Sequence, residues 1–118
     1  MKTVVVVDDN KMFLETLKDF IECDYYNCVA FSNPEDALRY VMENEVYAVV
    51  SDFEMPQMSG LELAKKIIEA ISETKIIIMS GYDTNYLRKC VLGVGIDEKK
   101  IQLLCKSDIL NLFDLLDS

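Results

Sequence analysis

Residues 46–60, VYAVVSDFEMPQMSG, join a strand-like run to a loop and decide the fold. The first five residues are all apolar, and β-branched and aromatic side chains dominate them, as is typical of a strand buried on both faces. The run stops near Asp52, and the loop-forming residues Pro56 and Gly60 follow before an amphipathic helix begins at Leu61. A single carboxylate therefore lies where a strand opens into a loop, and the carboxyl ends of strands are where open parallel sheets bind ligands.

The composition is that of one globular domain with an acidic surface. Of the 118 residues, 51% are hydrophobic and 28% are charged, and the formal net charge is −9. This charge disfavours nucleic acid and anionic membranes, so we expect neither partner. The apolar runs are too short to span a bilayer, and Met1 and Lys2 lead directly into a strand rather than a signal peptide. We expect a single cytoplasmic domain over residues 1–118.

Histidine is absent, which excludes histidine general bases and histidine-containing metal sites. The four cysteines lack C-x-x-C spacing, and three of them lie in apolar, periodic segments: Cys23, Cys28, Cys90 and Cys105. Free cysteine in such segments packs as a small hydrophobic residue. We therefore expect reduced, structural cysteines, as suits a cytosolic protein.

Four further apolar runs are typical of buried strands, over residues 3–7, 28–31, 75–79 and 101–105. Helical periodicity between and after the runs predicts five helices, ending near residues 21, 42, 71, 91 and 116. Polar residues suited to capping precede three of these helices: Asn10 or Asp9, Asn33 followed by Pro34, and Ser107 or Asp108. The pattern is strand–helix repeated five times.

Continuous apolar strands that alternate with amphipathic helices indicate an α/β protein whose parallel sheet is covered on both faces. Right-handed crossovers leave few possible layouts. We predict a (βα)5 doubly wound, flavodoxin-like sheet of five strands in the order 2-1-3-4-5.

Polar side chains end four of the five predicted strands. Asp8 and Asp9 follow the first strand, Asp52 the third, Ser80 the fourth and Lys106 the fifth. In the predicted layout these strand ends are neighbours at one edge of the sheet. Each residue also has an ordinary explanation as a helix cap, a loop residue or a solvated lysine, but their joint placement favours a site.

The residue types point to phosphoryl transfer. Three carboxylates held close together repel one another unless cations or protons neutralise them, and Mg²⁺ suits a site with two or three carboxylates and several waters. Mg²⁺ would neutralise an incoming phosphoryl group and let a carboxylate act as its nucleophile. Ser80 would donate a hydrogen bond to a phosphoryl oxygen, and Lys106 would supply a point charge. The product would be an aspartyl phosphate.

With these positions in place, the chain resembles a receiver domain of the two-component response regulators, similar to the single-domain chemotaxis regulators. The similarity rests on Asp8-Asp9, on the D-x-x-M-P-x-M-x-G motif of residues 52–60, on Ser80-Gly81 and on Lys106. It covers essentially the whole chain.

The resemblance implies a phosphorylation-dependent signalling switch rather than an enzyme. Asp52 would accept the phosphoryl group from a sensor histidine kinase or a histidine phosphotransfer protein. Asp8, Asp9, Asp52 and the main-chain carbonyl of Glu54 would hold Mg²⁺. The absence of histidine agrees with a phosphoryl donor on another protein. Output would pass through protein contacts on the face formed by the fourth helix, the fifth strand and the fifth helix.

Three features depart from the family. Leu103 stands where the family has an aromatic switch residue, and Tyr82 or Tyr86 is the alternative aromatic residue for such a relay. Ser107 stands where proline usually follows the lysine, and we predict a trans Lys106–Ser107 bond. The link over residues 95–100 is longer than usual.

The last helix is unusually apolar. Ile109, Leu112, Phe113 and Leu116 would form its core face, while Leu110 projects outward and Leu115 lies on the opposite flank. Scattered surface leucines are common, and a partner or dimer contact is the alternative. We expect a monomer or a weak homodimer.

Two other functions fit parts of the sequence. A pseudo-receiver would be an interaction module whose output does not depend on phosphorylation, and Leu103 and Ser107 are compatible with it. An enzyme would be an aspartate-nucleophile phosphatase or a nucleotide-binding protein. The phosphatase would need an added cap segment, and the nucleotide-binding protein would need a glycine-rich turn after the first strand, which is absent.

Overall fold

The computed structural model describes residues 1–118 and contains one five-stranded parallel sheet with the order β2-β1-β3-β4-β5, as predicted. The strands are β1 (Lys2–Val7), β2 (Tyr26–Phe31), β3 (Ala48–Asp52), β4 (Lys75–Ser80) and β5 (Ile101–Cys105). The helices are α1 (Lys11–Ile21), α2 (Pro34–Glu43), α3 (Gly60–Ala70), α4 (Thr84–Gly93) and α5 (Leu112–Asp117), with 3₁₀ helices η1 (Glu98–Lys100) and η2 (Lys106–Asn111).

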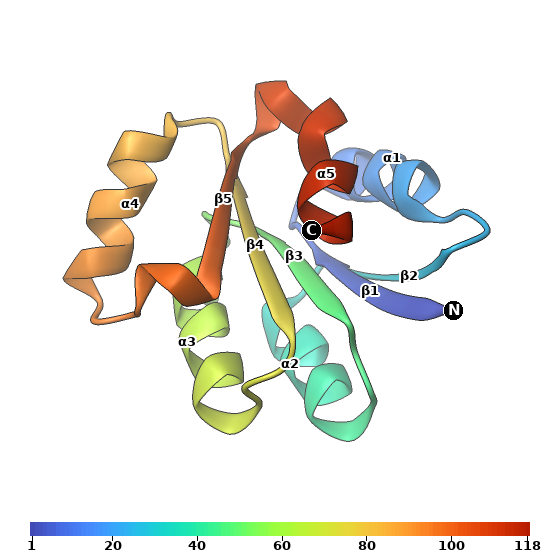
Figure 1. Ribbon diagram of the computed structural model, residues 1–118, viewed down its shortest axis with the longest axis horizontal. Helices are drawn as coiled ribbons and strands as arrows, with labels where there is room; N and C mark the ends of the chain where they lie inside the picture. Colours follow the sequence, from blue (N-terminus) through green and yellow to red (C-terminus); the bar gives the residue numbers. More distant parts are fainter.

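Two layers of helices enclose the sheet (Figure 1). Helices α1 and α5 cover one face, and α2, α3 and α4 cover the other. Alternate residues of the central strands supply the two cores: Val5 and Ile78 face α2–α4, whereas Val6 and Ile77 face α1 and α5. The continuous apolar runs are thus explained by burial on both faces.

Side-chain caps fix where the helices begin. Asn10 accepts a hydrogen bond from the Phe13 amide at 3.1 Å, and Asn33 caps α2 ahead of Pro34, so both predicted caps are confirmed and Asp9 is not the cap. Satisfying these free amides fixes the helix entry points.

Two predicted strands begin two residues away from their observed starts, two others differ by one residue at one end, and the last helix also differs. Strand β2 begins at Tyr26 rather than Cys28, because the exposed Asn27 takes the outward position of the period-two pattern. Strand β3 begins at Ala48 rather than Val46. The last helix begins as η2, whose Asp108 has φ −103° and ψ 27°, and neither Ser107 nor Asp108 caps it. All peptide bonds are trans, including Lys106–Ser107 as predicted.

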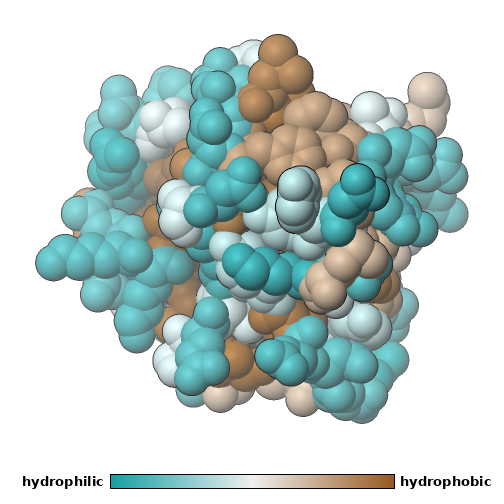
Figure 2. All heavy atoms as spheres, turned by 45° about the vertical axis from the view of Figure 1, so that its right-hand side comes forward, coloured by the Kyte–Doolittle hydropathy of each residue, from teal (hydrophilic) through white to brown (hydrophobic).

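The predicted core face of the last helix is confirmed, with one correction at Leu115. Met42 is exposed, and α4 packs through Leu87 and Val91 while Tyr86 faces solvent. In α5, Leu115 is half-buried and packs against the core instead of lying on an outer flank. Leu110 is 80% exposed. Figure 2 shows an apolar area near the top of the view, where η2 and α5 meet α1, within a largely hydrophilic surface.

Residues at the amino edge of the sheet hold the end of α5. The Tyr47 hydroxyl donates a hydrogen bond to the Leu116 carbonyl, and Lys75 Nζ donates to the Leu115 and Leu116 carbonyls at 2.9 and 3.2 Å. Lys2 Nζ lies 4.2 Å from the centroid of the Tyr47 ring. These donors satisfy carbonyls that the end of such a short helix leaves unpaired.

All four cysteines are free thiols. Cys28 is buried and Cys90 and Cys105 are half-buried, whereas Cys23 is exposed, so structural burial is confirmed for Cys28 and wrong for Cys23. None of the helices has both the length and the apolar character required to cross a bilayer.

We expect alkaline conditions to weaken the fold through Cys28. Burial raises the pKa of its thiol from 9.0 to about 12. Above pH 9.0 the unfolded chain releases this proton while the folded chain retains it, so the free energy of unfolding falls as pH rises toward 12. Denaturant titrations from neutral to alkaline pH should show a smaller fall for Cys28→Ala than for the wild type, by about 1–2 kcal/mol. Parallel curves for the two proteins would contradict this.

Candidate functional site

Asp52 is the last residue of β3 and is buried in a rigid strand-to-loop junction. The Phe53 amide donates to the Met79 carbonyl at 2.8 Å, which ties the junction to β4. The Gly60 amide donates to the Phe53 carbonyl at 2.8 Å, which ties the loop to the start of α3. Both bonds restrict the position of the Asp52 carboxylate.

Gly60 is required by the close approach of α3 to this junction. A Cβ atom at position 60 would lie 2.2 Å from the Asp52 carbonyl oxygen, well inside any normal contact distance. Ser59, which precedes it, caps α3 by accepting a hydrogen bond from the Glu62 amide at 3.1 Å. The motif glycine therefore lets the helix begin directly against the backbone of the candidate phosphoacceptor.

Three carboxylates converge as the sequence predicts. Asp8, Asp9 and Asp52 each place one carboxylate oxygen within 4.8 Å of the others. The Asp8 side chain is fully buried and accepts a hydrogen bond from the Asn10 amide at 2.9 Å, whereas Asp9 is exposed. The order of the strands produces this cluster, because β1 and β3 are neighbours.

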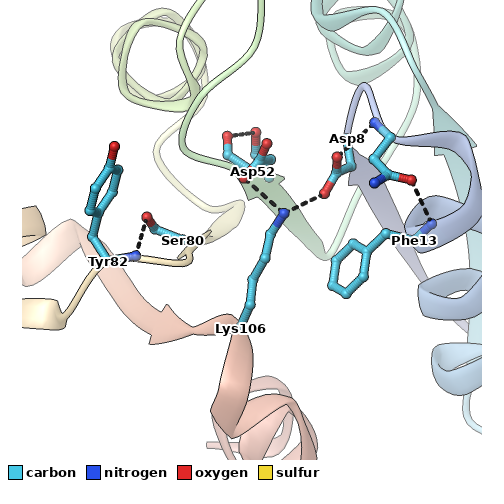
Figure 3. Close-up of polar contacts among 8 residues, drawn as sticks. Asp8, Phe13, Asp52, Ser80, Tyr82 and Lys106 are labelled. Atoms are coloured by element: carbon cyan, nitrogen blue, oxygen red, sulfur yellow. Dashed lines mark hydrogen bonds and ion pairs between the residues drawn. The ribbon is translucent and has the colours of Figure 1, made fainter.

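Lys106 lies between two of these carboxylates (Figure 3). Its Nζ is 3.0 Å from Asp8 Oδ2 and 3.2 Å from Asp52 Oδ1. The same ammonium lies 4.5 Å from the centroid of the Phe13 ring, a cation–π contact that the sequence did not predict. Residues 98 positions apart in the sequence thus form one ion-pair network.

The charges of the site oppose one another. Burial, followed by the charge of Asp8, raises the pKa of Asp52, although Lys106 acts to lower it. Burial acts to lower the pKa of Lys106, but its hydrogen bond to Asp8 and the charge of Asp52 outweigh burial and raise it. The site therefore holds a firmly protonated Lys106 beside Asp52, whose charged form is disfavoured by burial and by Asp8.

Ser80 and Glu54 complete the wall of a shallow pocket. The pocket has a volume of about 490 Å³ and is lined by Asp52, Glu54, Ser80, Gly81, Tyr82 and Lys106. Ser80 Oγ accepts a hydrogen bond from the Tyr82 amide at 3.0 Å, so the hydroxyl belongs to the turn after β4 (Figure 3). The structure thus brings together every predicted site residue, with Asp9 and Glu54 at the exposed rim.

An aromatic group on the same rim was not predicted as a unit. The Phe53 ring packs edge-on against Tyr82 and Tyr86, with centroid distances of 6.4 and 6.3 Å. Tyr82 and Tyr86 are each 49% exposed, and Leu103 of β5 is half-buried against the core beneath α4. In the sequence, the signal for this group is Phe53, the aromatic residue that directly follows the strand ending at Asp52.

The acidic cluster fits a hard divalent cation. Carboxylate oxygens are the ligands that Mg²⁺ prefers, and Asp8, Asp9 and Asp52 supply them from two adjacent strand ends. A partly exposed cluster also leaves room for the waters that Mg²⁺ retains. The residues present are therefore suitable for holding this ion.

A doubly wound sheet with clustered carboxylates and a lysine at its carboxyl edge is the arrangement of a receiver-type α/β domain. Residues 4–101 match the family of the response regulator receiver domain. The chain belongs to this receiver family, and solved structures with a similar fold are response regulators.

Curated relatives include regulators longer than this chain. The response regulator GtcR of Aneurinibacillus migulanus is 28% identical over 82% of this chain and 40% of its own length. The transcriptional regulatory protein YdfI of Bacillus subtilis is 38% identical over 74% of this chain and 41% of its own. The chemotaxis protein CheV2 of Helicobacter pylori is 29% identical over 98% of this chain and 37% of its own. The chain thus spans about two fifths of the length of these relatives.

Solved structures extend the likeness through β5 and α5. The response regulator TrrA of Thermotoga maritima, in complex with Mg²⁺–BeF, is 28% identical, has a TM-score of 0.81 and covers 98% of this chain and 99% of its own. A CheY-like receiver domain from Methanospirillum hungatei, 23% identical with a TM-score of 0.80, covers 99% and 94% and shares the fold.

Proposed function

We propose that this domain is a phosphorylation-dependent switch in which Asp52 accepts a phosphoryl group. The observation that carries the proposal is the convergence of the Asp8, Asp9 and Asp52 oxygens within 4.8 Å beside Lys106. Receiver domains are signalling domains rather than classical enzymes. The phosphoryl donor would be a phosphohistidine on a sensor kinase or a phosphotransfer protein, and the site of action would be cytoplasmic.

Each site residue has a separate role in the phosphoryl transfer. An Asp52 carboxylate oxygen bonds to phosphorus while the bond from phosphorus to the donor imidazole nitrogen breaks, and the imidazole keeps the electron pair. Lys106 balances the negative charge of the transferred group, and the Ser80 hydroxyl turns from the Tyr82 amide to donate to a phosphoryl oxygen. Asp8, Asp9, Asp52 and the Glu54 carbonyl would hold Mg²⁺, which when bound neutralises phosphoryl charge.

The output would pass through protein–protein contacts. Phosphorylation adds about −1.5 to −2 charges and strong acceptor oxygens beside Ser80, so it biases the turn between β4 and α4. That turn leads into the α4–β5–α5 face, where we place a downstream protein partner. We propose a monomer or weak homodimer, with Leu110 available for association.

The test is incubation with a small phosphodonor and Mg²⁺. We expect incorporation of one phosphoryl group into the wild type by intact mass, loss of incorporation on chelation of Mg²⁺, and none in Asp52→Asn. Asp52→Asn should remain folded, because it removes a carboxylate that burial and Asp8 destabilise. Labelling that persists in Asp52→Asn would refute the assignment.

A pseudo-receiver makes a different prediction in the same experiment. Leu103 in β5 and the Ser80 hydroxyl bonded within its own turn are the observations that fit it. Equal partner binding with and without phosphodonor, in protein shown to be labelled, would favour this second function.

A further inference from the structure

The outer edge of β5 carries a groove that the phosphoryl-transfer chemistry does not use. Strand β5 is an edge strand paired only with β4, and Figure 1 shows it between α4 and α5 at the front of the view. The groove along it has a volume of about 640 Å³. Beyond the β4 ladder, the backbones of Gln102, Leu103 and Leu104 make no turn or loop hydrogen bond. An edge strand of this kind offers alternate amides and carbonyls to an added strand.

The walls of the groove combine apolar and charged side chains. Val91, Ile101, Leu103 and Leu115 supply its apolar surface, and Arg88 and Lys99 lie on its charged rim with Glu98. Apolar side chains flanking an open strand edge are what a bound extended peptide uses for its alternate side chains.

The α4 side of the groove carries a charge opposite to that of the rest of the chain. Residues 84–105 contain four of the 12 basic residues and two of the 21 acidic residues. The remaining residues therefore contain eight basic and 19 acidic residues. A partner segment that binds here gains from negative charge, whereas the rest of the surface repels it.

We propose that the β5 edge binds an extended, acidic segment of a partner protein as a sixth strand of the sheet. Backbone groups of β5 provide the pairing, the apolar wall receives alternate side chains, and Arg88 and Lys99 select acidic residues. Its dependence on phosphorylation rests on the proposed function, because the turn carrying Ser80 and Tyr82 leads directly into α4, one wall of the groove.

The test uses a synthetic peptide of alternating Glu and Val whose two termini are chemically blocked. Its length of about ten residues is enough to form a full strand. Nuclear magnetic resonance titration of the full chain should shift amides of β5 and α4, and hydrogen exchange of the outer β5 amides should slow. The same peptide with its central valines replaced by proline should bind at least about tenfold more weakly, because proline removes ladder donors.

Charge reversal supplies the matched comparison. The double variant Arg88→Glu/Lys99→Glu should weaken binding by about tenfold or more, whereas Arg39→Glu/Lys66→Glu, the same change on exposed α2 and α3 residues, should leave it nearly unchanged.

Four outcomes would overturn the proposal. These are no binding of the acidic peptide, equal binding of a Lys/Val counterpart, equal binding of the proline variant, or stronger binding of a single-stranded oligonucleotide to the same amides. Labelling of Asp52 in the same samples separates the two claims: labelled protein that fails to bind peptide defeats the docking proposal alone. Peptide binding in protein that cannot be labelled defeats the proposed switch alone.

Discussion

Replacing Gly60 with alanine should lower the free energy of unfolding by about 3 kcal/mol and the melting temperature by about 10 °C or more. The added Cβ would lie 2.2 Å from the Asp52 carbonyl oxygen. Because this is a backbone atom and not the tip of a flexible side chain, the clash can be relieved only if the backbone moves. The movement would disturb the hydrogen bond from the Gly60 amide to the Phe53 carbonyl. Phosphoryl labelling of the surviving folded protein should therefore also slow.

Gly93→Ala is the matched control. Gly93 is the last residue of α4, a Cβ there meets no atom within 4 Å, and its φ is not positive. Alanine in this helical position should leave stability unchanged or raise it by about 0.5–1 kcal/mol. Equal thermal stability of Gly60→Ala and the wild type would show that α3 can shift freely, contrary to the geometry.

Lys106→Met should destabilise the metal-free protein by about 3 kcal/mol at neutral pH. The variant keeps most of the side-chain volume beside Phe13 but removes the cation that lies 3.0 Å from Asp8 and 3.2 Å from Asp52. The Asp8 and Asp52 side chains are only 1% and 11% exposed, so water replaces the lost charge poorly. Denaturant titration in the presence of chelator measures the effect.

Mg²⁺ should partly compensate for the missing ammonium. A cation that binds the folded carboxylates but not the unfolded chain stabilises by mass action, and the gain should be larger in Lys106→Met than in the wild type. Lys66→Met, on the exposed surface of α3, should change neither the stability nor the response to Mg²⁺. An identical Mg²⁺ response in Lys106→Met and the wild type would contradict the role of Lys106 as the counter-charge of the cluster.

The strand order and the acidic cluster could be predicted because local signals determine them. Continuous apolar runs indicate strands that are buried on both faces. Asn10 and Asn33 indicate where helices start, because their side chains accept hydrogen bonds from amides of the first helical turn. Once the order of parallel strands is known, the residues that end them must meet. Asp8, Asp52 and Lys106 could therefore be predicted to be neighbours, although they lie far apart in the sequence.

Other features depend on packing that no local pattern encodes. The apolar spacing of residues 109–116 is the same for a single α-helix and for a 3₁₀ turn followed by a short helix, and the backbone at Asp108 decides between them. Leu115 is drawn toward the core by the short α5, and Ser80 bonds to its own turn. The contact of Lys106 with the Phe13 ring likewise arises only when α1 and η2 meet.

The contacts of Tyr47 indicate that this fold would tolerate circular permutation. Lys2 lies over the Tyr47 ring and the Leu116 carbonyl accepts from the Tyr47 hydroxyl, so the first strand and the last helix converge on one side chain. That side chain precedes β3, whereas the acidic cluster lies at the opposite, carboxyl end of the same strand. A short linker between these two segments would close the backbone into a ring, and new termini could then open in a surface loop without rearranging the phosphoacceptor pocket.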